Sequence, residues 1–253
     1  MTRPEIGVHL RDAAPLITAV KAAMVRDHLL LDFEQALPDP DGVTVYISNH
    51  GPVFAPLLAP ALTVDRLLQL GGYDELVAVT LFHRFVQVMP GVAPLLRRYF
   101  GHSTRQLQSL SGLMEMIRAR RFNILGTTPE GSSSTFCYDE PIGAFTRPGL
   151  MLAALQSDAQ MVLAAQKGAE VFGQPVRLPG DLRLPMPHAP RGLMLPFWYP
   201  GCRADVTVRY RRYEPTLSAD ELEALPRDER RRRLGLELTR VRRQLLELYR
   251  SIP

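Results

Sequence analysis

The amino-acid sequence predicts an α/β fold, a single layered domain with a mainly parallel central sheet flanked by helices. Short apolar runs typical of buried strands alternate with helical segments from residue 43 to residue 165, and this alternation is the signature of parallel sheets. The 253 residues are 46% hydrophobic and 22% charged, which is enough apolar material for one sizeable core. We expect one domain over residues 1–253, with a helix at about 12–35, a core at about 43–215 and C-terminal helices at about 218–250.

The first elements follow from periodicity and turn chemistry. Apolar residues recur at helical spacing over residues 12–35, and Pro15 stands near the start. A turn cluster at residues 38–42 leads into a strand at 43–47. The apolar, proline-rich run after His50 predicts an irregular helical start that continues to about Leu70, where two glycines end it.

The same alternation continues through the rest of the chain. Ser103 or Thr104 is a candidate cap for a helix with one apolar face, and a proline-rich stretch at 173–201 predicts a long loop or partial strand. The last helices are expected to break at Pro226. Further strands are expected at 76–82, 122–125, 161–165 and 206–210, and a further helix at about 148–156.

Charge and composition restrict the function classes only partly. The net charge is +4 and nearly all of it is arginine, since Lys21 and Lys167 are the two lysines. Arginine suits phosphate, but this charge fits anionic lipid, nucleotide-bearing cofactors and nucleic acid equally well. The two cysteines lack metal-ligand spacing, so no metal is expected. No apolar stretch reaches 18 residues, and we expect a cytoplasmic protein that can touch the inner face of a membrane peripherally.

A histidine follows the first predicted strand of the alternating region, in Ser48-Asn49-His50-Gly51. Histidine takes a proton from a hydroxyl near neutral pH, which turns the oxygen into a nucleophile. Gly51 beside it leaves room for a substrate. The alternative is a histidine that merely bonds a backbone carbonyl.

A polar turn, Thr128-Pro129-Glu130-Gly131-Ser132, follows the strand predicted at 122–125. Glu130 is a candidate acceptor for a substrate hydroxyl, and Gly131 and Ser132 are candidate donors to a phosphate or a developing oxyanion. The alternative is an ordinary turn. Since sites form at the carboxyl ends of parallel strands, His50 and Glu130 are expected at the same edge.

Arg105 stands near the start of a predicted helix, in His102-Ser103-Thr104-Arg105. An arginine and the free amides of a helix N-terminus together hold phosphate well. The alternative is a solvated surface arginine.

Taken in order, these segments resemble the motif blocks of the glycerophosphate and lysophospholipid acyltransferase family, whose first block is a histidine followed five residues later by an aspartate. The resemblance covers roughly residues 12–250. The segments that carry it are Asn49-His50, the Gly-containing stretch 89–101 that leads to Arg105, Thr128-Pro129-Glu130-Gly131-Ser132, and the late strand region 206–215.

The resemblance implies an O-acyltransferase of phospholipid metabolism. A fatty acyl group would pass from acyl-CoA or acyl carrier protein to a hydroxyl of a lysophospholipid, glycerophosphate or related lipid, with no cofactor beyond that co-substrate and no nucleic-acid partner. His50 would be the catalytic base and Arg105 would hold the acceptor phosphate. The implied substrate-binding set is Asn49, Arg105, Glu130, Gly131 and Ser132.

The sequence departs from the family pattern at three places. Position 55 is alanine where the first block has its aspartate, residues 160–165 lack the prolines of the family's fourth block, and residue 132 is serine where the family often has threonine. That aspartate orients the histidine, and loss of the equivalent group from a serine-protease triad slows turnover on the order of 10⁴-fold. Three alternatives follow. Another carboxylate replaces it, for instance Asp65, Asp74 or Glu75; the histidine works unassisted on a reactive donor; or the fold binds lipid or acyl carrier protein without turnover.

Other function classes have weaker support. Gly131-Ser-Ser-Ser-Thr135 is not the Gly-x-Ser-x-Gly turn of serine hydrolases. The basic run 227–233 contains Asp228 and Glu229, and Glu229 is spaced for a helical ion pair with Arg233, so a solvated helix face is expected rather than a nucleic-acid site. Residues 197–199, Phe-Trp-Tyr, suit either a membrane interface or the core.

Overall fold

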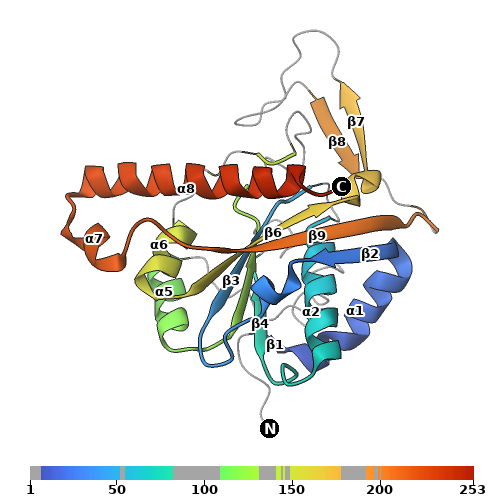
Figure 1. Ribbon diagram of the computed structural model, residues 1–253, viewed down its shortest axis with the longest axis horizontal. Helices are drawn as coiled ribbons and strands as arrows, with labels where there is room; N and C mark the ends of the chain where they lie inside the picture. Colours follow the sequence, from blue (N-terminus) through green and yellow to red (C-terminus); the bar gives the residue numbers. More distant parts are fainter. Residues whose placement is uncertain are drawn as a thin grey trace.

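A seven-stranded sheet runs through the middle of the molecule, in the order β1-β4-β5-β3-β6-β9-β2, and helices cover both of its faces (Figure 1). The computed structural model describes residues 7–51, 55–81, 109–130, 141–143, 145, 149–177, 192–196, 199 and 201–253. The strands of this sheet are β1 (Val8–His9), β2 (Val25–Leu31), β3 (Thr44–Ser48), β4 (Val77–Thr80), β5 (Ile124–Thr127), β6 (Gln160–Lys167) and β9 (Ala204–Tyr213). The helices are α1 (Leu10–Met24), α2 (Leu58–Leu70), α5 (Leu110–Arg118), α6 (Gly149–Gln156), α7 (Ala219–Ala224) and α8 (Arg227–Arg250), with 3-10 turns η1 (Phe33–Ala36), η2 (Ala55–Leu57) and η4 (Ala169–Phe172).

Four central strands give the sheet its direction. Strands β4, β5, β3 and β6 pair with one another in parallel, so their carboxyl ends share one edge. Strand β9 is antiparallel to β6, β2 is parallel to β9, and β1 is antiparallel to β4. The predicted α/β fold with a mainly parallel sheet is therefore confirmed.

Alternation along the strands divides the core into two layers. On β3, Val45 and Ile47 belong to the cluster packed under α5, α6 and α8, whereas Tyr46 belongs to the cluster under α1 and α2. Strand β6 alternates in the same way, with Leu163 on the first side and Val162 on the second. Because successive strand residues point to opposite faces, a continuous apolar run buries both faces of a central strand.

The helix predicted over residues 12–35 ends much earlier, at Met24, and that prediction is wrong for its second half. The chain passes directly into β2, an edge strand paired in parallel with β9. Asp27 and His28, which interrupt the apolar stripe of the predicted helix, lie in this strand. The partner that satisfies this backbone lies about 180 residues away in sequence, so local periodicity carries no signal of it.

Several other boundaries follow the predicted signals. Helix α2 ends at Leu70, and its C-cap Gly71 has a φ of 74°, a positive value that glycine adopts readily. The break between α7 and α8 falls at Pro226, as expected. Ser109 caps α5, and its side chain accepts the Gly112 N–H at 3.1 Å, whereas the predicted caps Ser103 and Thr104 lie outside the described residues. Residues 101–108 lie outside the described part of the chain.

The proline-rich stretch at 173–201 contains a hairpin that the sequence indicated only as a loop or partial strand. Strands β7 (Gly173–Arg177) and β8 (Gly192–Pro196) pair antiparallel as a separate two-stranded sheet. The hairpin projects from the body beyond the end of β6 (Figure 1).

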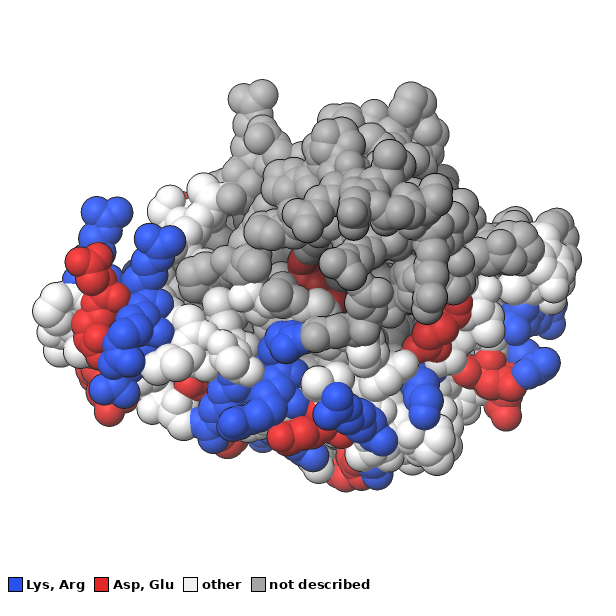
Figure 2. All heavy atoms as spheres, turned by 90° about the horizontal axis from the view of Figure 1, so that it is seen from above, with Lys and Arg blue, Asp and Glu red and all other residues white. Residues whose placement is uncertain are grey.

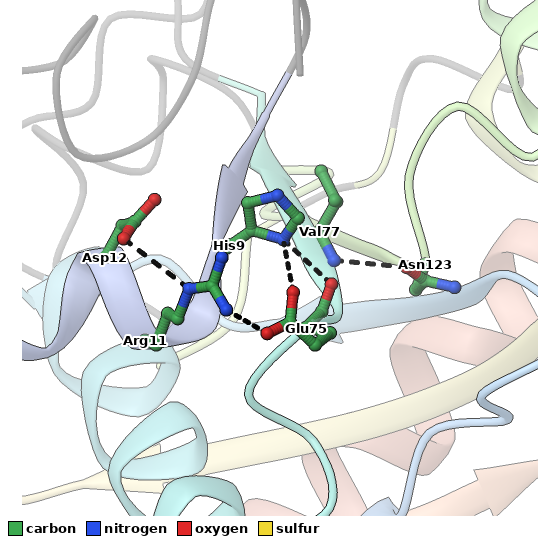
Figure 3. A network of polar contacts seen from close by, with 6 residues as sticks. All are labelled: His9, Arg11, Asp12, Glu75, Val77 and Asn123. Carbon is green, nitrogen blue, oxygen red and sulfur yellow. Dashed lines mark hydrogen bonds and ion pairs between the residues drawn. The ribbon is translucent and has the colours of Figure 1, made fainter. Parts of the chain in front are cut away.

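Polar contacts tie the amino edge of the sheet together (Figure 3). His9 Nδ1 lies 2.9 Å from the carbonyl oxygen of Glu75, whose carboxylate pairs with Arg11. Beside them, Asn123 Oδ1 accepts the Val77 N–H at 3.1 Å. These contacts join β1, β4 and the entry to β5 at the edge opposite the carboxyl ends.

The charged surface is mixed in sign. Figure 2 shows one face of the molecule, on which Lys and Arg side chains are interspersed with Asp and Glu over the described residues. At the start of α8, the Glu229 carboxylate pairs with Arg232 at 2.6 Å and Arg233 at 3.0 Å, so the predicted helical ion pair is confirmed. None of the helices in the described ranges is long and apolar enough to cross a membrane.

Candidate functional site

Asn49 fixes the backbone immediately before His50. Its side-chain NH₂ donates to the Gln166 carbonyl at 3.0 Å, and its Oδ1 accepts the Gln166 N–H at 2.8 Å. The Gln166 side chain returns a bond to the Asn49 carbonyl at 3.1 Å. The two residues are 2% and 1% exposed, so these bonds form without competition from water and lock the ends of β3 and β6 together.

The same glutamine extends the lock to a helix. Gln166 Oε1 accepts the Ala59 N–H at 3.2 Å, close to the start of α2. The first amides of a helix have no partner within the helix, and this side chain supplies one. The end of β3, the end of β6 and the start of α2 are thus held as one unit around His50.

Glu130 reaches His50 from the neighbouring strand. It follows β5, which pairs in parallel with β3, and its Oε1 accepts the His50 backbone N–H at 2.7 Å. Its Oε2 accepts the Gly143 N–H at 2.5 Å, and the residue is only 3% exposed. The structure therefore brings the two motifs predicted from the sequence together, because the Glu130 carboxylate accepts hydrogen bonds from the backbone amides of both His50 and Gly143.

An arginine from α8 holds the loop that supplies Gly143. The Arg242 side chain donates to the Gly143 carbonyl at 2.9 Å from Nε and to the Ile142 carbonyl at 2.8 Å from Nη2. Contacts therefore run from Arg242 through the loop to Glu130, and from Glu130 to His50.

The imidazole of His50 has a defined tautomer. Its Nδ1 lies 2.9 Å from the Gly51 carbonyl oxygen, and a carbonyl only accepts hydrogen bonds. Nδ1 therefore carries the proton, and in the neutral ring Nε2 carries the lone pair. A backbone carbonyl thus orients the ring, the role that the resemblance assigned to the family's aspartate.

Burial controls the charge of both groups. Burial lowers the pKa of His50 below its ordinary value, and the hydrogen bond to Gly51 opposes this shift. The lowered pKa keeps the imidazole neutral and able to accept a proton. Burial raises the pKa of Glu130, whereas the amides of Gly143 and His50 and the positive charge of Arg242 oppose that rise.

The carboxylates considered as substitutes for the missing aspartate stand elsewhere. Asp74 and Glu75 precede β4, so they lie at the amino edge of the sheet, opposite to His50. Asp65, on α2, pairs with Lys21 and accepts from Gln69 at 2.8 Å. These contacts occupy Asp65 with α1 and with its own helix.

The sequence-predicted site residues fall into two groups. His50, Asn49 and Glu130 come together at the carboxyl edge, as their positions after β3 and β5 predicted. Arg105, Gly131 and Ser132 lie outside the described residues, as do Phe197 and Trp198, and their expected roles stay predictions.

The sequence reasoning missed Gln166, Gly143 and Arg242. Gln166 gave a weak signal, as a polar residue near the end of an otherwise apolar strand. Arg242 gave a weaker one, since it adjoins the buried stripe of α8. Gly143 gave no signal in the sequence.

An apolar cavity of about 50 Å³ opens between the sheet and α2, and Ser48, two residues before His50, is part of its wall. A second apolar cavity of about 50 Å³ lies beside it against α1 and shares Pro60, Val64, Ala78 and Thr80 with the first. The other walls of the first cavity are formed by Tyr46, Ala59, Thr63, Leu67, Val79, Ile124, Gly126 and Ala164.

The comparison with solved structures supports this architecture. No protein-family model matches the sequence, and none of the curated proteins searched matches it. Among solved structures, the chain is similar to the crystal structure of the 1-acyl-sn-glycerophosphate (LPA) acyltransferase PlsC from Thermotoga maritima. The TM-score is 0.51 at 13% identity, over 96% of this chain and 78% of that one. The chain therefore has the α/β fold seen in that acyltransferase.

Proposed function

We propose that this protein is an O-acyltransferase. It moves a fatty acyl group from acyl-CoA or acyl carrier protein to a hydroxyl of a lysophospholipid, glycerophosphate or related lipid. The observation that carries the proposal is the His50 imidazole at the carboxyl edge, with Nδ1 committed to the Gly51 carbonyl and the ring neutral. The fold shared with the Thermotoga maritima enzyme supports it.

The reaction needs one base. Nε2 of His50 accepts the proton of the acceptor hydroxyl while the hydroxyl oxygen attacks the thioester carbonyl carbon, forming a C–O bond and a tetrahedral oxyanion. Collapse of the oxyanion breaks the C–S bond. The imidazolium then returns its proton to the thiolate, so the products are an ester and a free thiol, and the histidine is neutral again.

The surrounding residues hold this base in place. Glu130 fixes the backbone of His50 by accepting its N–H, and Asn49 fixes the residue before it through Gln166. In the proposal Arg105 holds the acceptor phosphate, and Gly131 and Ser132, which directly follow Glu130, position the acceptor with it.

In this proposal the apolar cavity under α2, with its volume of about 50 Å³, takes a few methylene groups of the acyl chain. Ser48, two residues before His50, is part of the cavity wall, and most of the other wall residues are apolar. Burial of methylene groups there contributes about 0.8 kcal/mol each. Because the acceptor is a lipid, the proposal includes peripheral contact with the inner face of a membrane.

One observation favours a second function. The group bonded to Nδ1 is an uncharged carbonyl, and Ala55 stands where the family has aspartate, so an imidazolium is stabilised less than in an aspartate-assisted site. The alternative is a catalytically impaired protein of this fold that binds lipid or acyl carrier protein without turnover.

A thiol-release assay distinguishes the acyltransferase from the binding protein. The protein is mixed with palmitoyl-CoA and lysophosphatidate, thiol release is followed with a thiol reagent, and the lipid product is identified by mass spectrometry. Acceptor-dependent thiol release that disappears in His50→Ala supports the transferase. Saturable binding of palmitoyl-CoA without thiol release, repeated with acyl carrier protein as donor, contradicts it and supports the binding protein.

A further inference from the structure

We infer that Arg242 is a positioning residue for His50, acting from α8 through the loop at residues 142–143 and the carboxylate of Glu130. For its effect on turnover this inference rests on the proposed function. Its effect on the hydrogen bonds of the site does not, and the experiment uses that difference.

Helix α8 gives Arg242 a fixed origin. The helix runs for 24 residues, and Val241 and Leu245, on either side of Arg242 in sequence, are fully buried against the sheet. The Arg242 side chain is itself partly buried. Its guanidinium is therefore presented from a rigid element to the loop beneath it.

The contacts with the loop are directional. Nε donates to the Gly143 carbonyl at 2.9 Å, Nη2 donates to the Ile142 carbonyl at 2.8 Å, and Ile142 is fully buried. Two carbonyls held by one planar cation fix both the position and the twist of the peptide that joins them. Charge-assisted bonds of this kind are roughly twice as strong as neutral ones.

The fixed loop in turn orients Glu130. The Gly143 N–H donates to Oε2 at 2.5 Å, and Oε1 is then directed at the His50 N–H at 2.7 Å. Both bonds need oxygens that carry no proton. The positive charge of Arg242 opposes the rise in the pKa of Glu130 that burial causes, so it also favours this ionised state.

Three elements act on the Glu130 carboxylate in the described part of the chain. His50 meets it from the end of β3, Gly143 meets it from the loop, and Arg242 acts on it as a charge from α8. Removal of the guanidinium raises the pKa of Glu130 further. As Glu130 takes up a proton, one of the two amides loses its acceptor and His50 is released from its position.

The test that does not depend on activity uses NMR of the full chain labelled with ¹⁵N. The amide resonances of His50 and Gly143 report the protonation of Glu130 as pH is lowered. In Arg242→Met the midpoint of this titration moves to higher pH, and in Arg242→Lys, which keeps the charge, it moves less. The matched control is Arg243→Met, because Arg243 is the next residue of α8, 69% exposed and 4.0 Å from Glu247. A folded Arg242→Met whose titration matches the wild type overturns the inference.

A double-mutant cycle tests the route. Arg242→Met lowers kcat about tenfold with little change in KM, as expected when a residue that positions the base without contacting the substrate is lost. In a Glu130→Gln background the same substitution changes kcat by less than about twofold, because the contacts that connect Arg242 to His50 are already broken at Glu130. Full additivity overturns the inference. If the wild type shows no acyl transfer at all, the proposed function fails while the NMR result still decides on Arg242.

Discussion

The backbone N–H of His50 donates to Oε1 of Glu130 across 2.7 Å, although the two residues are 80 positions apart in the sequence. The contact is possible because β3 and β5 pair in parallel and both residues follow the carboxyl ends of their strands. Glu130 therefore acts on the backbone of the histidine, and the ring is held separately by Gly51.

Substitution of Glu130 by glutamine tests this division of roles. A carboxamide keeps one acceptor but points an NH₂ group at either the His50 or the Gly143 amide, so a buried donor loses its partner. We expect the free energy of unfolding to fall by about 1–3 kcal/mol and kcat to fall about 10- to 100-fold. Urea denaturation and thiol-release kinetics measure the two effects.

Glu229→Gln is the control, since Glu229 is a surface carboxylate on α8 paired with arginines. It should leave kcat unchanged. Wild-type kinetics in Glu130→Gln would show that the carboxylate does not hold His50.

The pH dependence of kcat/KM follows from the direction of the pKa shifts. His50 acts as a base only when it is neutral, and burial lowers its pKa, so activity should persist below the ordinary histidine value of about 6.5. The rate then falls as pH drops through the pKa of His50 in the folded protein. The raised pKa of Glu130 adds a second loss on the same acidic side. A pH–rate profile whose acidic midpoint lies above 6.5 is incompatible with this environment for His50.

Asn49→Ala tests the lock between β3 and β6. The substitution leaves the Gln166 N–H and carbonyl without their side-chain partners in a site where both residues are almost fully buried. We expect a loss of about 2–4 kcal/mol in the free energy of unfolding, since each unsatisfied buried group costs roughly 1–3 kcal/mol. Gln69→Ala, which removes an exposed hydrogen bond to Asp65, should cost less than about 0.5 kcal/mol. Equal stability losses in the two variants would refute the lock.

The sequence predicted the central part of this fold well because its signals there are local. Residues 43–47 form a mostly apolar run, with Thr44 as its one clearly polar member, which suits a strand covered on both faces, and β3 occupies that position. The order strand, histidine, strand, glutamate then placed His50 and Glu130 at one edge without any knowledge of their contact.

The parts that could not be predicted depend on distant partners. Strand β2 exists because β9, far along the chain, supplies its hydrogen bonds, and residues 25–31 alone fit a helix as well. The acceptor for His50 Nδ1 is a backbone carbonyl, which every residue carries, so no pattern of side chains in the sequence predicts this contact. Arg242 reaches the site from a helix about 190 positions after His50, with the spacing of an ordinary surface residue.

Gly126→Val tests the proposed acyl cavity. Gly126 is part of the cavity wall on β5, and a Cβ there would stand 3.4 Å from the Thr80 hydroxyl, a distance that the neighbouring side chain can accommodate. The added methyl groups occupy the cavity, so we expect preference to shift from long to short acyl-CoA donors while the fold is retained. Rates measured over a series of chain lengths give the result. An unchanged chain-length profile in a folded variant would place the acyl chain elsewhere.

The most direct measurement is acceptor-dependent thiol release by His50→Ala compared with the wild type, with palmitoyl-CoA and lysophosphatidate as substrates. His28→Ala is the control, because His28 is an exposed histidine on the edge strand β2. We predict that kcat/KM falls about 10²- to 10⁴-fold in His50→Ala, as for loss of a general base, and stays at the wild-type level in His28→Ala. Acyl transfer at the wild-type rate in a folded His50→Ala protein would contradict the account.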